Sequence, residues 1–576
     1  MHRQAFPPHH LLHILGGIAA LLAFCFSPAW AQIDRSQEML REKIEQLRLL
    51  KSLNIGEASI VSAIVVPDFY ERRAFRLAWE ERSSVDELLR AIRDSEADGL
   101  DPRDYHLVTL ERLRDALAAS PTPMPGMRAD FDIVLTDALV RLNYHLMFGK
   151  VDPERLDPSW NMSRDINGFE PAVLMQQALD SGLLYQALEN EKPTHAFYSG
   201  LKAALAQYRA IKAAGGWPRI PAGPSLKLGM HDNRIPTLRR RLIVTGDLGS
   251  SPSDGSAIFD TALAEAVKVF QRRHGLTADG VLGSGTLAAL NVPVEERIQQ
   301  LLVNLERGRW VLHHLGDTFL VVNVAGYHAY YVKDGQMVWQ GRAQVGNPYR
   351  QTPSFKAEMT YLVFNPNWTV PPTIFSQDYL PSLKRDPGYA RRKGLKVVDR
   401  AGRVVDAGRV DWSRYSANNT PYLLRQDPGP RNSLGRVKFV FPNDHAVFLH
   451  DTPNQALFNK TERAFSSGCI RVENALELAR LLLNDDSEWN RQAIDRVVGN
   501  EKTRTVVLYE PVPVLLLYWT AWVGADGRLN FRHDFYSRDK LVLQGLTGGF
   551  RFPKRPIVRA PVESSQAISM DGWNVE

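Results

Sequence analysis

The chain has 576 residues, 44% of them hydrophobic and 23% charged, which is typical of a folded soluble protein and excludes a disordered or fibrous one. This length predicts several domains rather than one compact core. A net charge of +6 is a thin excess that gives no reason to expect a nucleic-acid partner, and two cysteines exclude a disulfide scaffold and a cysteine-rich metal site.

The N-terminus has the pattern of an export signal. Arg3 precedes an apolar run over residues 11–26, and Ala29-Trp30-Ala31 has the small-x-small pattern of a signal-peptidase site. The run is shorter than the roughly 20 residues of a membrane span. We therefore expect a signal peptide over residues 1–31, cleaved after Ala31, with an uncleaved anchor as the alternative. Cleavage also removes Cys25, so the mature chain keeps a single cysteine.

Residues 32–221 are predicted to form a mainly helical domain. Apolar residues recur at helical spacing over residues 131–148 and 196–211, and the sequence Gly215-Gly216-Trp217-Pro218 then marks a boundary. The acidic segment 98–106 contains three Asp residues and a His, but Asp and Gly at this density before Pro are more typical of turns than of a metal site.

A smaller unit of three short helices is predicted over residues 225–292. Its segment FQRRHGLTADGVLGSGTLAALN resembles the peptidoglycan-binding type 1 domain. The resemblance implies either a module that contacts glycan or peptide, or a spacer. The residues that carry it are Phe270, Gln271, Gly275, Leu276, Asp279, Gly280, Gly283 and Thr286.

From residue 317 onward the pattern changes to strands. Asp334-Gly335 between two apolar runs predicts a hairpin, and further strand-like runs follow at 359–364, 437–441 and 446–449. The polar stretch from Pro371 to about Gly435 is too long for an ordinary connection and is predicted to be a lid over an active site.

Cys469 lies in the loop sequence Ser466-Ser467-Gly468-Cys469, and apolar residues recur at helical spacing from Val472 onward. This pattern predicts that Cys469 lies at a helix N-terminus, where the helix dipole together with Arg471 lowers the pKa of the thiol. Such a thiol would act as a nucleophile, with the Gly468 and Cys469 amides available to an oxyanion. An inert, buried cysteine is the alternative.

A thiol nucleophile also needs a general base. His450 ends a predicted strand 19 residues before Cys469. From the residues alone, His445, His274, His313 and His314 stay open as well.

The segment HDTPNQALFNKTERAFSSGCIRVENA resembles the active-site signature of the YkuD-domain L,D-transpeptidases, and most closely their large Gram-negative, YcbB-type members. The resemblance implies a multidomain α+β fold: a helical scaffold, a small three-helix peptidoglycan-binding module, and a mostly β catalytic domain with an inserted capping subdomain. The expected bounds are 32–221, 225–292 and 317–510, with the capping insertion at 373–435, a segment packing on the scaffold at 511–545 and a loose tail at 546–576.

The resemblance also implies roles for single residues. Cys469 matches the nucleophile and His450 the general base, whose ring the carbonyl of Asp451 orients. Gly468 and Ser467 supply the backbone around the oxyanion. Arg471 and Trp368 match substrate-facing residues, with a loop anchor and core packing as equal rivals. Tyr422 and Asn432 are further candidates for substrate contact in or beside the insertion.

The implied activity is formation of 3→3 cross-links between peptidoglycan stem peptides in the periplasm, without a metal or other cofactor. The implied partners are donor and acceptor stems, cell-wall synthases and carbapenem inhibitors. An L,D-carboxypeptidase, an enzyme that attaches a lipoprotein, and an inactive peptidoglycan-binding scaffold are the alternatives.

Overall fold

The computed structural model describes residues 35–163, 170–250, 255–313, 315–416 and 419–549. The chain divides into two compact units, the first made of residues up to Leu89, Tyr105–Arg141 and Phe169–Leu184, and the second of the rest. The expected signal peptide lies outside the described residues, as does the expected tail apart from its first residues. Across the described ranges, no helix combines the length and the apolar character of a membrane span.

The first unit is mainly helical. Tyr70 on α3 donates to the Asp132 carboxylate on α6 at 2.6 Å, and the amides of Ala78 and Trp79 donate to the same carboxylate. Burial raises the pKa of Asp132 to about 6. This carboxylate therefore ties the segment after α3 to α6. The elements are α2 (Arg35–Leu50), β1 (Leu53–Ile55), β2 (Ala58–Ile60), α3 (Val65–Arg72), α5 (Leu107–Ala119) and α8 (Pro171–Asp180), while α4 (Arg82–Asp94) and α6 (Pro125–Phe148) contribute to both units.

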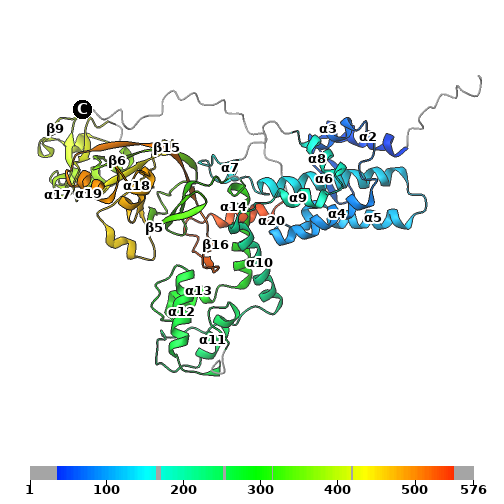
Figure 1. Cartoon of the computed structure of the whole chain (residues 1–576), viewed down its shortest axis with the longest axis horizontal. Coiled ribbons are helices and arrows are strands. Elements are labelled where there is room, and N and C mark those ends of the chain that lie inside the picture. Colours follow the sequence, from blue (N-terminus) through cyan, green and yellow to red (C-terminus); the bar gives the residue numbers. More distant parts are fainter. Residues whose placement is uncertain (1–34, 164–169, 251–254, 314, 417–418, 550–576) are drawn as a thin grey trace, which may run out of the picture. The chain divides into compact units, whose positions relative to one another are not determined.

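Two long helices of the second unit, α10 (Ala196–Ala213) and α14 (Val294–Val311), pack side by side (Figure 1). Their contact buries Leu201 and Leu205 against Leu301 and Leu305. The predicted break after α10 is confirmed, because Gly215 and Gly216 both have positive φ, which favours glycine. Helix α14 was not predicted. The short helices α7 (Pro153–Leu156) and α9 (Leu184–Asn190) belong to the same region.

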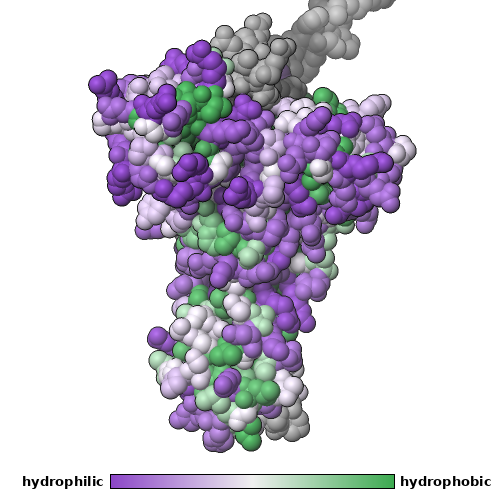
Figure 2. Space-filling model, turned by 90° about the vertical axis from the view of Figure 1, so that its left-hand side faces the viewer, coloured by the Kyte–Doolittle hydropathy of each residue, from purple (hydrophilic) through white to green (hydrophobic). Residues whose placement is uncertain are grey.

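The small module contains α11 (Ile235–Val244), α12 (Thr261–Arg273) and α13 (Ser284–Leu290) around an apolar core. The Gln271 amide holds the loop between α12 and α13: its nitrogen donates to Asp279 and Thr286, and its oxygen accepts from the Gly280 amide. Figure 2 shows hydrophobic residues on the surface of this module, at the lower end of the view. Its exposed apolar side chains include Leu228, Met230 and Ile258.

The strands after residue 317 form a nine-stranded sheet in the order β13-β5-β14-β12-β11-β6-β15-β3-β4, which closes on itself because β4 also pairs with β5. The predicted hairpin between β4 and β5 is confirmed, since Asp334 and Gly335 both have positive φ as a type I′ turn requires. The strands are β3 (Phe319–Asn323), β4 (His328–Lys333), β5 (Gln336–Gly346), β6 (Lys356–Phe364), β11 (Val437–Val440), β12 (Leu449–His450), β13 (Ala464–Ser466), β14 (Ile470–Val472) and β15 (Arg504–Leu517).

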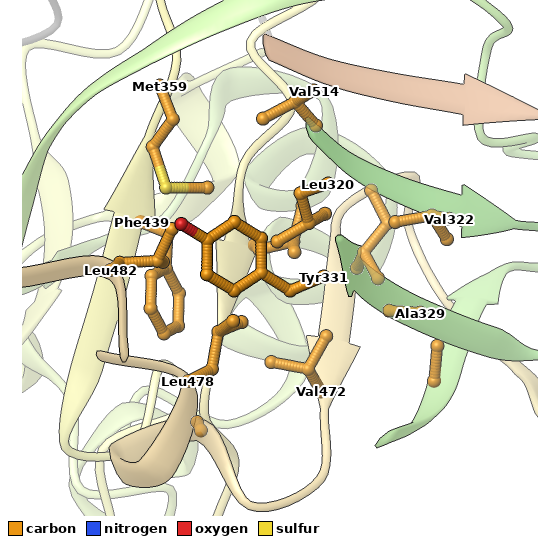
Figure 3. Packing of buried hydrophobic residues seen from close by; sticks show 14 of the residues in the cluster. Leu320, Val322, Ala329, Tyr331, Met359, Phe439, Val472, Leu478, Leu482 and Val514 are labelled. Atoms are coloured by element: carbon orange, nitrogen blue, oxygen red, sulfur yellow. The ribbon is translucent and has the colours of Figure 1, made fainter. Parts of the chain in front are cut away.

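The interior of this sheet is apolar and also receives α18 (Ala475–Leu483) and α19 (Arg491–Gly499). Figure 3 shows the ring of Tyr331 among aliphatic side chains from strands on several sides, with Leu478 and Leu482 contributed by α18. Burial of this kind stabilises a fold by about 25 cal/mol per Å² of apolar surface. The core fixes which strand faces remain available for polar chemistry.

The inserted subdomain has a core of its own, which the prediction of a polar lid did not anticipate. A four-stranded sheet, β7-β10-β8-β9, packs with short helices around Phe375, Leu383, Trp412 and Leu424. We call this part, from β7 to residue 435, the capping subdomain. Its elements are β7 (Trp368–Thr369), α15 (Pro372–Ile374), the π-helical turn η4 (Phe375–Tyr379), α16 (Leu380–Arg385), α17 (Tyr389–Arg392), β8 (Lys396–Val398), β9 (Val404–Val405) and β10 (Leu423–Gln426).

The predicted domain boundary at residue 510 is wrong. Strand β15 runs from Arg504 to Leu517 between β6 and β3, with a bulge between Val507 and Val512, so residues 511–517 belong to the nine-stranded sheet. After it come β16 (Ala521–Val523), β17 (Leu529–Phe531) and α20 (Asp539–Thr547), and Trp519 packs on Phe197 of α10 at 4.3 Å between ring centroids. The predicted multidomain α+β class itself is confirmed.

Candidate active site

Strands β12 and β14 are parallel neighbours and bring His450 and Cys469 to one face of the sheet. Leu449 pairs with Ile470, and His450 pairs with Arg471. Leu449 and Ile470 are fully buried in the core. Because side chains alternate along a strand, His450 and Arg471 project from the opposite face, as does Cys469, two residues before Arg471.

The His450 ring is oriented by its own backbone neighbourhood. It is only 4% exposed, and Nδ1 lies 2.5 Å from the carbonyl oxygen of Asp451. A carbonyl can only accept, so Nδ1 carries the proton and Nε2 keeps its lone pair. Burial, reinforced by the positive charge of Arg471, lowers the pKa of His450 to about 3. The ring is therefore neutral at physiological pH, which is the protonation state that a general base starts from.

Cys469 does not lie at a helix N-terminus. It precedes strand β14, and the following helix α18 begins only at Ala475. Burial raises the pKa of the thiol above its usual range, although the Phe448 amide and the charges of Lys438 and Arg471 oppose the rise. The predicted thiolate is therefore wrong for this state, because desolvation outweighs the positive charges. The side chain is partly accessible, and its sulfur lies 3.7 Å from the carbonyl oxygen of Ala446.

The residues before Cys469 form a tightly bonded loop, which we call the nucleophile loop (residues 466–469). Ser466 Oγ donates to the Cys469 carbonyl at 2.6 Å and accepts from the Gly468 amide at 3.2 Å. Thr352 Oγ1 donates to the Gly468 carbonyl at 2.8 Å. Gly468 has φ 118°, a conformation that favours glycine. To donate to an oxyanion, the Gly468 amide must first give up its hydrogen bond to Ser466 Oγ.

A polar row crosses the sheet through His450. Arg471 Nη1 donates to Gln344 Oε1 at 3.1 Å on one side. On the other side Lys438 pairs with His450, and its ammonium lies 4.4 Å from the Phe448 ring centroid. Gln344 and Lys438 were missed from the sequence, because nothing in it shows that β5 and β11 flank the catalytic strands. The guanidinium of Arg471 brings positive charge into the site, and burial lowers its pKa.

The other candidate histidines that the structure describes belong to other parts of the fold. His445 lies in the exposed turn before β12, and its ring lies 4.8 Å from that of Phe355. His274 is buried in the small module, stacked on Phe270. His313 follows α14, and His314 lies outside the described residues.

The three remaining candidates for substrate contact lie in the capping subdomain. Trp368 and Tyr422 are half-buried and pack with other aromatic residues, Trp368 with Tyr379 and Tyr422 with Trp412. Asn432 is 2% exposed, and its amide nitrogen donates to the carbonyls of Pro366 and Asp427. The prediction for Asn432 is therefore wrong: its side chain is already used to shape the connection back to the sheet.

The acidic segment near residue 100 is held by ion pairs. Asp98 pairs with Lys192 and Lys202, and Asp104 pairs with Lys150. Among the described residues, no three His, Cys, Asp or Glu side chains are grouped as metal ligands.

Comparison with protein families adds to this geometry. Residues 317–508 match the L,D-transpeptidase catalytic domain model, named YkuD. The described site, with Cys469 and His450, lies within that range. Residues 317–508 are thus similar to L,D-transpeptidase catalytic domains. Two further models match outside it, a scaffold domain at residues 65–205 and a peptidoglycan binding domain at 231–290.

A Haemophilus influenzae protein with the curated name "Putative L,D-transpeptidase" is 35% identical over 244 residues, which is 42% of this chain and 49% of that protein. The match thus spans about half the length of this relative. Two solved structures share weak similarity. The Ldtfm–avibactam carbamoyl enzyme has 13% identity over 39% of this chain and 64% of its own, with a TM-score of 0.18. An L,D-transpeptidase of Xylanimonas cellulosilytica has 16% identity over 52% of this chain and 99% of its own, with a TM-score of 0.16. Similarities this weak carry no weight for the function.

Proposed function

We propose that the protein is a peptidoglycan L,D-transpeptidase that uses Cys469 as its nucleophile. The observation that carries the proposal is the pairing of β12 with β14, which brings a neutral imidazole and the cysteine of an L,D-transpeptidase domain to one face of the sheet. The proposed donor is a tetrapeptide stem, cleaved between meso-diaminopimelate and D-alanine. The proposed product is a 3→3 cross-link.

The first half-reaction forms a thioester. The thiol leaves its contact with the Ala446 carbonyl and passes its proton to Nε2 of His450 while the sulfur attacks the carbonyl carbon of diaminopimelate. The carbon–nitrogen bond to D-alanine then breaks, and the imidazolium returns the proton to the leaving amine. The Asp451 carbonyl holds Nδ1–H throughout, so that Nε2 is the atom that exchanges the proton.

The second half-reaction transfers the acyl group. The side-chain amine of diaminopimelate on a second stem attacks the thioester and gives a proton to His450, and the Cys469 sulfur leaves and is reprotonated. Arg471 holds positive charge beside the reacting atoms and favours the negative charge that develops on the oxygen. The capping subdomain is the proposed barrier to water, whose entry would turn transfer into hydrolysis.

Product analysis tests this proposal. The purified protein is incubated with disaccharide-tetrapeptide, and the products are separated and sequenced by mass spectrometry. Dimers joined through two diaminopimelate residues are expected. Tripeptide alone would favour an L,D-carboxypeptidase at the same site. No product, together with no mass adduct after incubation with a carbapenem, would favour an inactive scaffold.

We also propose that the protein is exported to the periplasm and cleaved after Ala31. The support is the apolar run followed by the small-x-small sequence at the N-terminus. The intact mass of the protein purified from an envelope fraction tests it. A mass equal to that of the full chain would contradict cleavage.

A further inference from the structure

One guanidinium joins the capping subdomain to the nucleophile loop. Arg350 Nη1 and Nη2 donate to the two carboxylate oxygens of Asp378 at 2.7 and 2.8 Å, and Nη2 also donates to Gln377 at 2.6 Å. Both partners belong to the π-helical turn η4. Nη1 donates in addition to Ser467 Oγ at 2.9 Å, two residues before Cys469. Arg350 thus touches the lid and the loop of the nucleophile at once.

The segment that carries Arg350 is itself firmly held. Asn347 Oδ1 accepts from the Arg350 amide, and the Asn347 amide donates to the Ser466 carbonyl. Two residues after Arg350, the Thr352 amide donates to the hydroxyl of Tyr536, which in turn donates to the Gly346 carbonyl at 2.6 Å. The base of the Arg350 side chain is therefore fixed relative to strand β5.

This segment holds two consecutive residues of the nucleophile loop. Arg350 binds the side chain of Ser467, and Thr352 binds the carbonyl of Gly468. The Thr352–Gly468 contact does not involve the capping subdomain. The Arg350–Ser467 contact depends on where the Arg350 guanidinium lies. The carboxylate of Asp378 raises the pKa of Arg350 and sets that position.

The arrangement is poorly explained by stability alone. Asp378 is 45% exposed and Arg350 is 20% exposed, and an exposed ion pair contributes only about 0–1 kcal/mol. What a forked pair does supply is geometry, because two parallel bonds define the plane of the guanidinium. π-Helical turns such as η4 are also frequent at functional sites.

We propose that Arg350 is a positioning residue: with Asp378 it sets the geometry of the nucleophile loop according to the position of the capping subdomain. When the subdomain lies as described, Arg350 holds Ser467 and aligns the backbone that leads to Cys469. When η4 moves away, Asp378 no longer directs Arg350, and the loop loses that restraint. Acylation of Cys469 is thereby tied to a closed capping subdomain. The rate effects of this proposal rest on the proposed function.

The experiment compares Asp378→Asn, Ser467→Ala and the double variant with the wild type. Among the described residues, Asp378 and Ser467 are linked through the guanidinium of Arg350, so the effect of Asp378→Asn on the loop is expected to pass through Arg350. We expect Asp378→Asn to lower the rate of carbapenem acylation about ten- to a hundredfold, since a misplacement of reacting groups by about 1 Å can cost about a hundredfold. We expect Asp378→Asn to have no further effect once Ser467 is Ala. Arg350→Lys, which keeps the charge but not the fork, should behave like Asp378→Asn.

Arg392→Gln is the matched control. Arg392 forms an ion pair with Asp386 inside the capping subdomain, and both residues are exposed. Its loss should leave acylation within twofold of the wild type. A thermal unfolding midpoint measured for every variant separates a loss of alignment from a loss of folding.

A second measurement needs no activity. Hydrogen exchange of the amides at residues 466–469 should become faster in Asp378→Asn and stay unchanged in Arg392→Gln. If exchange and acylation in Asp378→Asn both match the control, or if the effects of Asp378→Asn and Ser467→Ala add independently, the positioning role is wrong. If the wild type is never acylated but the exchange result holds, the proposed function fails and the coupling stands.

Discussion

Two buried histidines of this chain each place Nδ1 against a backbone carbonyl, but in different surroundings. In the small module, Nδ1 of His274 lies 2.8 Å from the Phe270 carbonyl, and in the catalytic domain Nδ1 of His450 lies 2.5 Å from the Asp451 carbonyl. Burial lowers the pKa of both rings. His274 is packed between the rings of Phe270 and Phe531, whereas His450 shares a strand face with Cys469.

The difference teaches how to interpret a sequence motif. In the module, the motif residue Gln271 uses its amide nitrogen and oxygen within the fold, which makes it a structural residue. In the catalytic domain, the contact at Nδ1 leaves Nε2 of His450 with a lone pair. A motif residue is a candidate for catalysis when its reactive atom is left without a hydrogen bond inside the fold. It is structural when its polar atoms are already hydrogen-bonded there. Four substitutions test that distinction.

Cys469→Ala should have the largest effect. We expect transpeptidation to fall at least about a thousandfold, because removal of a nucleophile also removes the covalent route. Intact mass after incubation with a carbapenem should show one adduct in the wild type and none in the variant. Unchanged thermal unfolding is the control for folding. An adduct of equal size in Cys469→Ala would place the nucleophile elsewhere.

His450→Gln should lower the acylation rate about 10²- to 10⁴-fold, the usual contribution of a general base. The thiol itself remains, so alkylation by a small reagent at high pH should still label Cys469. His274→Gln is the comparison, and acylation in that variant should stay within a few-fold of the wild type. Equal losses in both variants would remove the distinction between the two rings.

The pH dependence of the unfolding free energy should contain a contribution from each of the two buried, neutral histidine rings. A ring whose pKa in the folded state lies below its unfolded value near 6.5 stays neutral in the fold, while the unfolded chain takes up a proton as the pH falls. Stability is therefore fully present above about pH 6.5 and is lost toward the folded pKa of His450, about 3. We expect His450→Gln to reduce the loss in unfolding free energy between pH 6.5 and 5 by about 2 kcal/mol. Denaturant unfolding at the two pH values measures it, and an unchanged loss would contradict the buried neutral ring.

Gln271→Ala should have the smallest effect on activity and a moderate effect on stability. Removing its amide leaves the Gly280 amide and Thr286 without their partner, which costs about 1–3 kcal/mol. Denaturant unfolding measures this loss, and acylation of Cys469 should remain within twofold. A large loss of acylation with unchanged stability would instead assign the module a direct part in the reaction.

Much of the fold follows from local patterns. The helical spacing over residues 131–148 and 196–211 corresponds to α6 and α10, and Asp334-Gly335 forms the predicted hairpin turn. These predictions succeed because amphipathic periodicity and turn chemistry are properties of consecutive residues. Helix α14 was not predicted. The domain boundary was placed at residue 510, next to two prolines, whereas strand β15 continues past it through a bulge.

The site shows the same division. Cys469 and His450 were selected from residue type and from a resemblance to a family, and the structure then brought them to one strand face. The predicted low thiol pKa was wrong because burial, which no local pattern reports, outweighs the charge of Arg471. The prediction that Asn432 contacts substrate was wrong because its amide donates to backbone carbonyls, including that of Pro366, which is far away in the chain.

By itself the sequence determined the order of domains, the class of the fold, the cysteine and histidine worth testing, and the family of the catalytic domain. Those are carried by residue identity and short-range pattern. Only the tertiary structure decided that Gln344 and Lys438 lie beside Arg471 and His450, that burial raises the pKa of the Cys469 thiol, and that Arg350 joins the capping subdomain to Ser467. The physical reason is that strand neighbours, desolvation and forked ion pairs depend on which distant segments pack together.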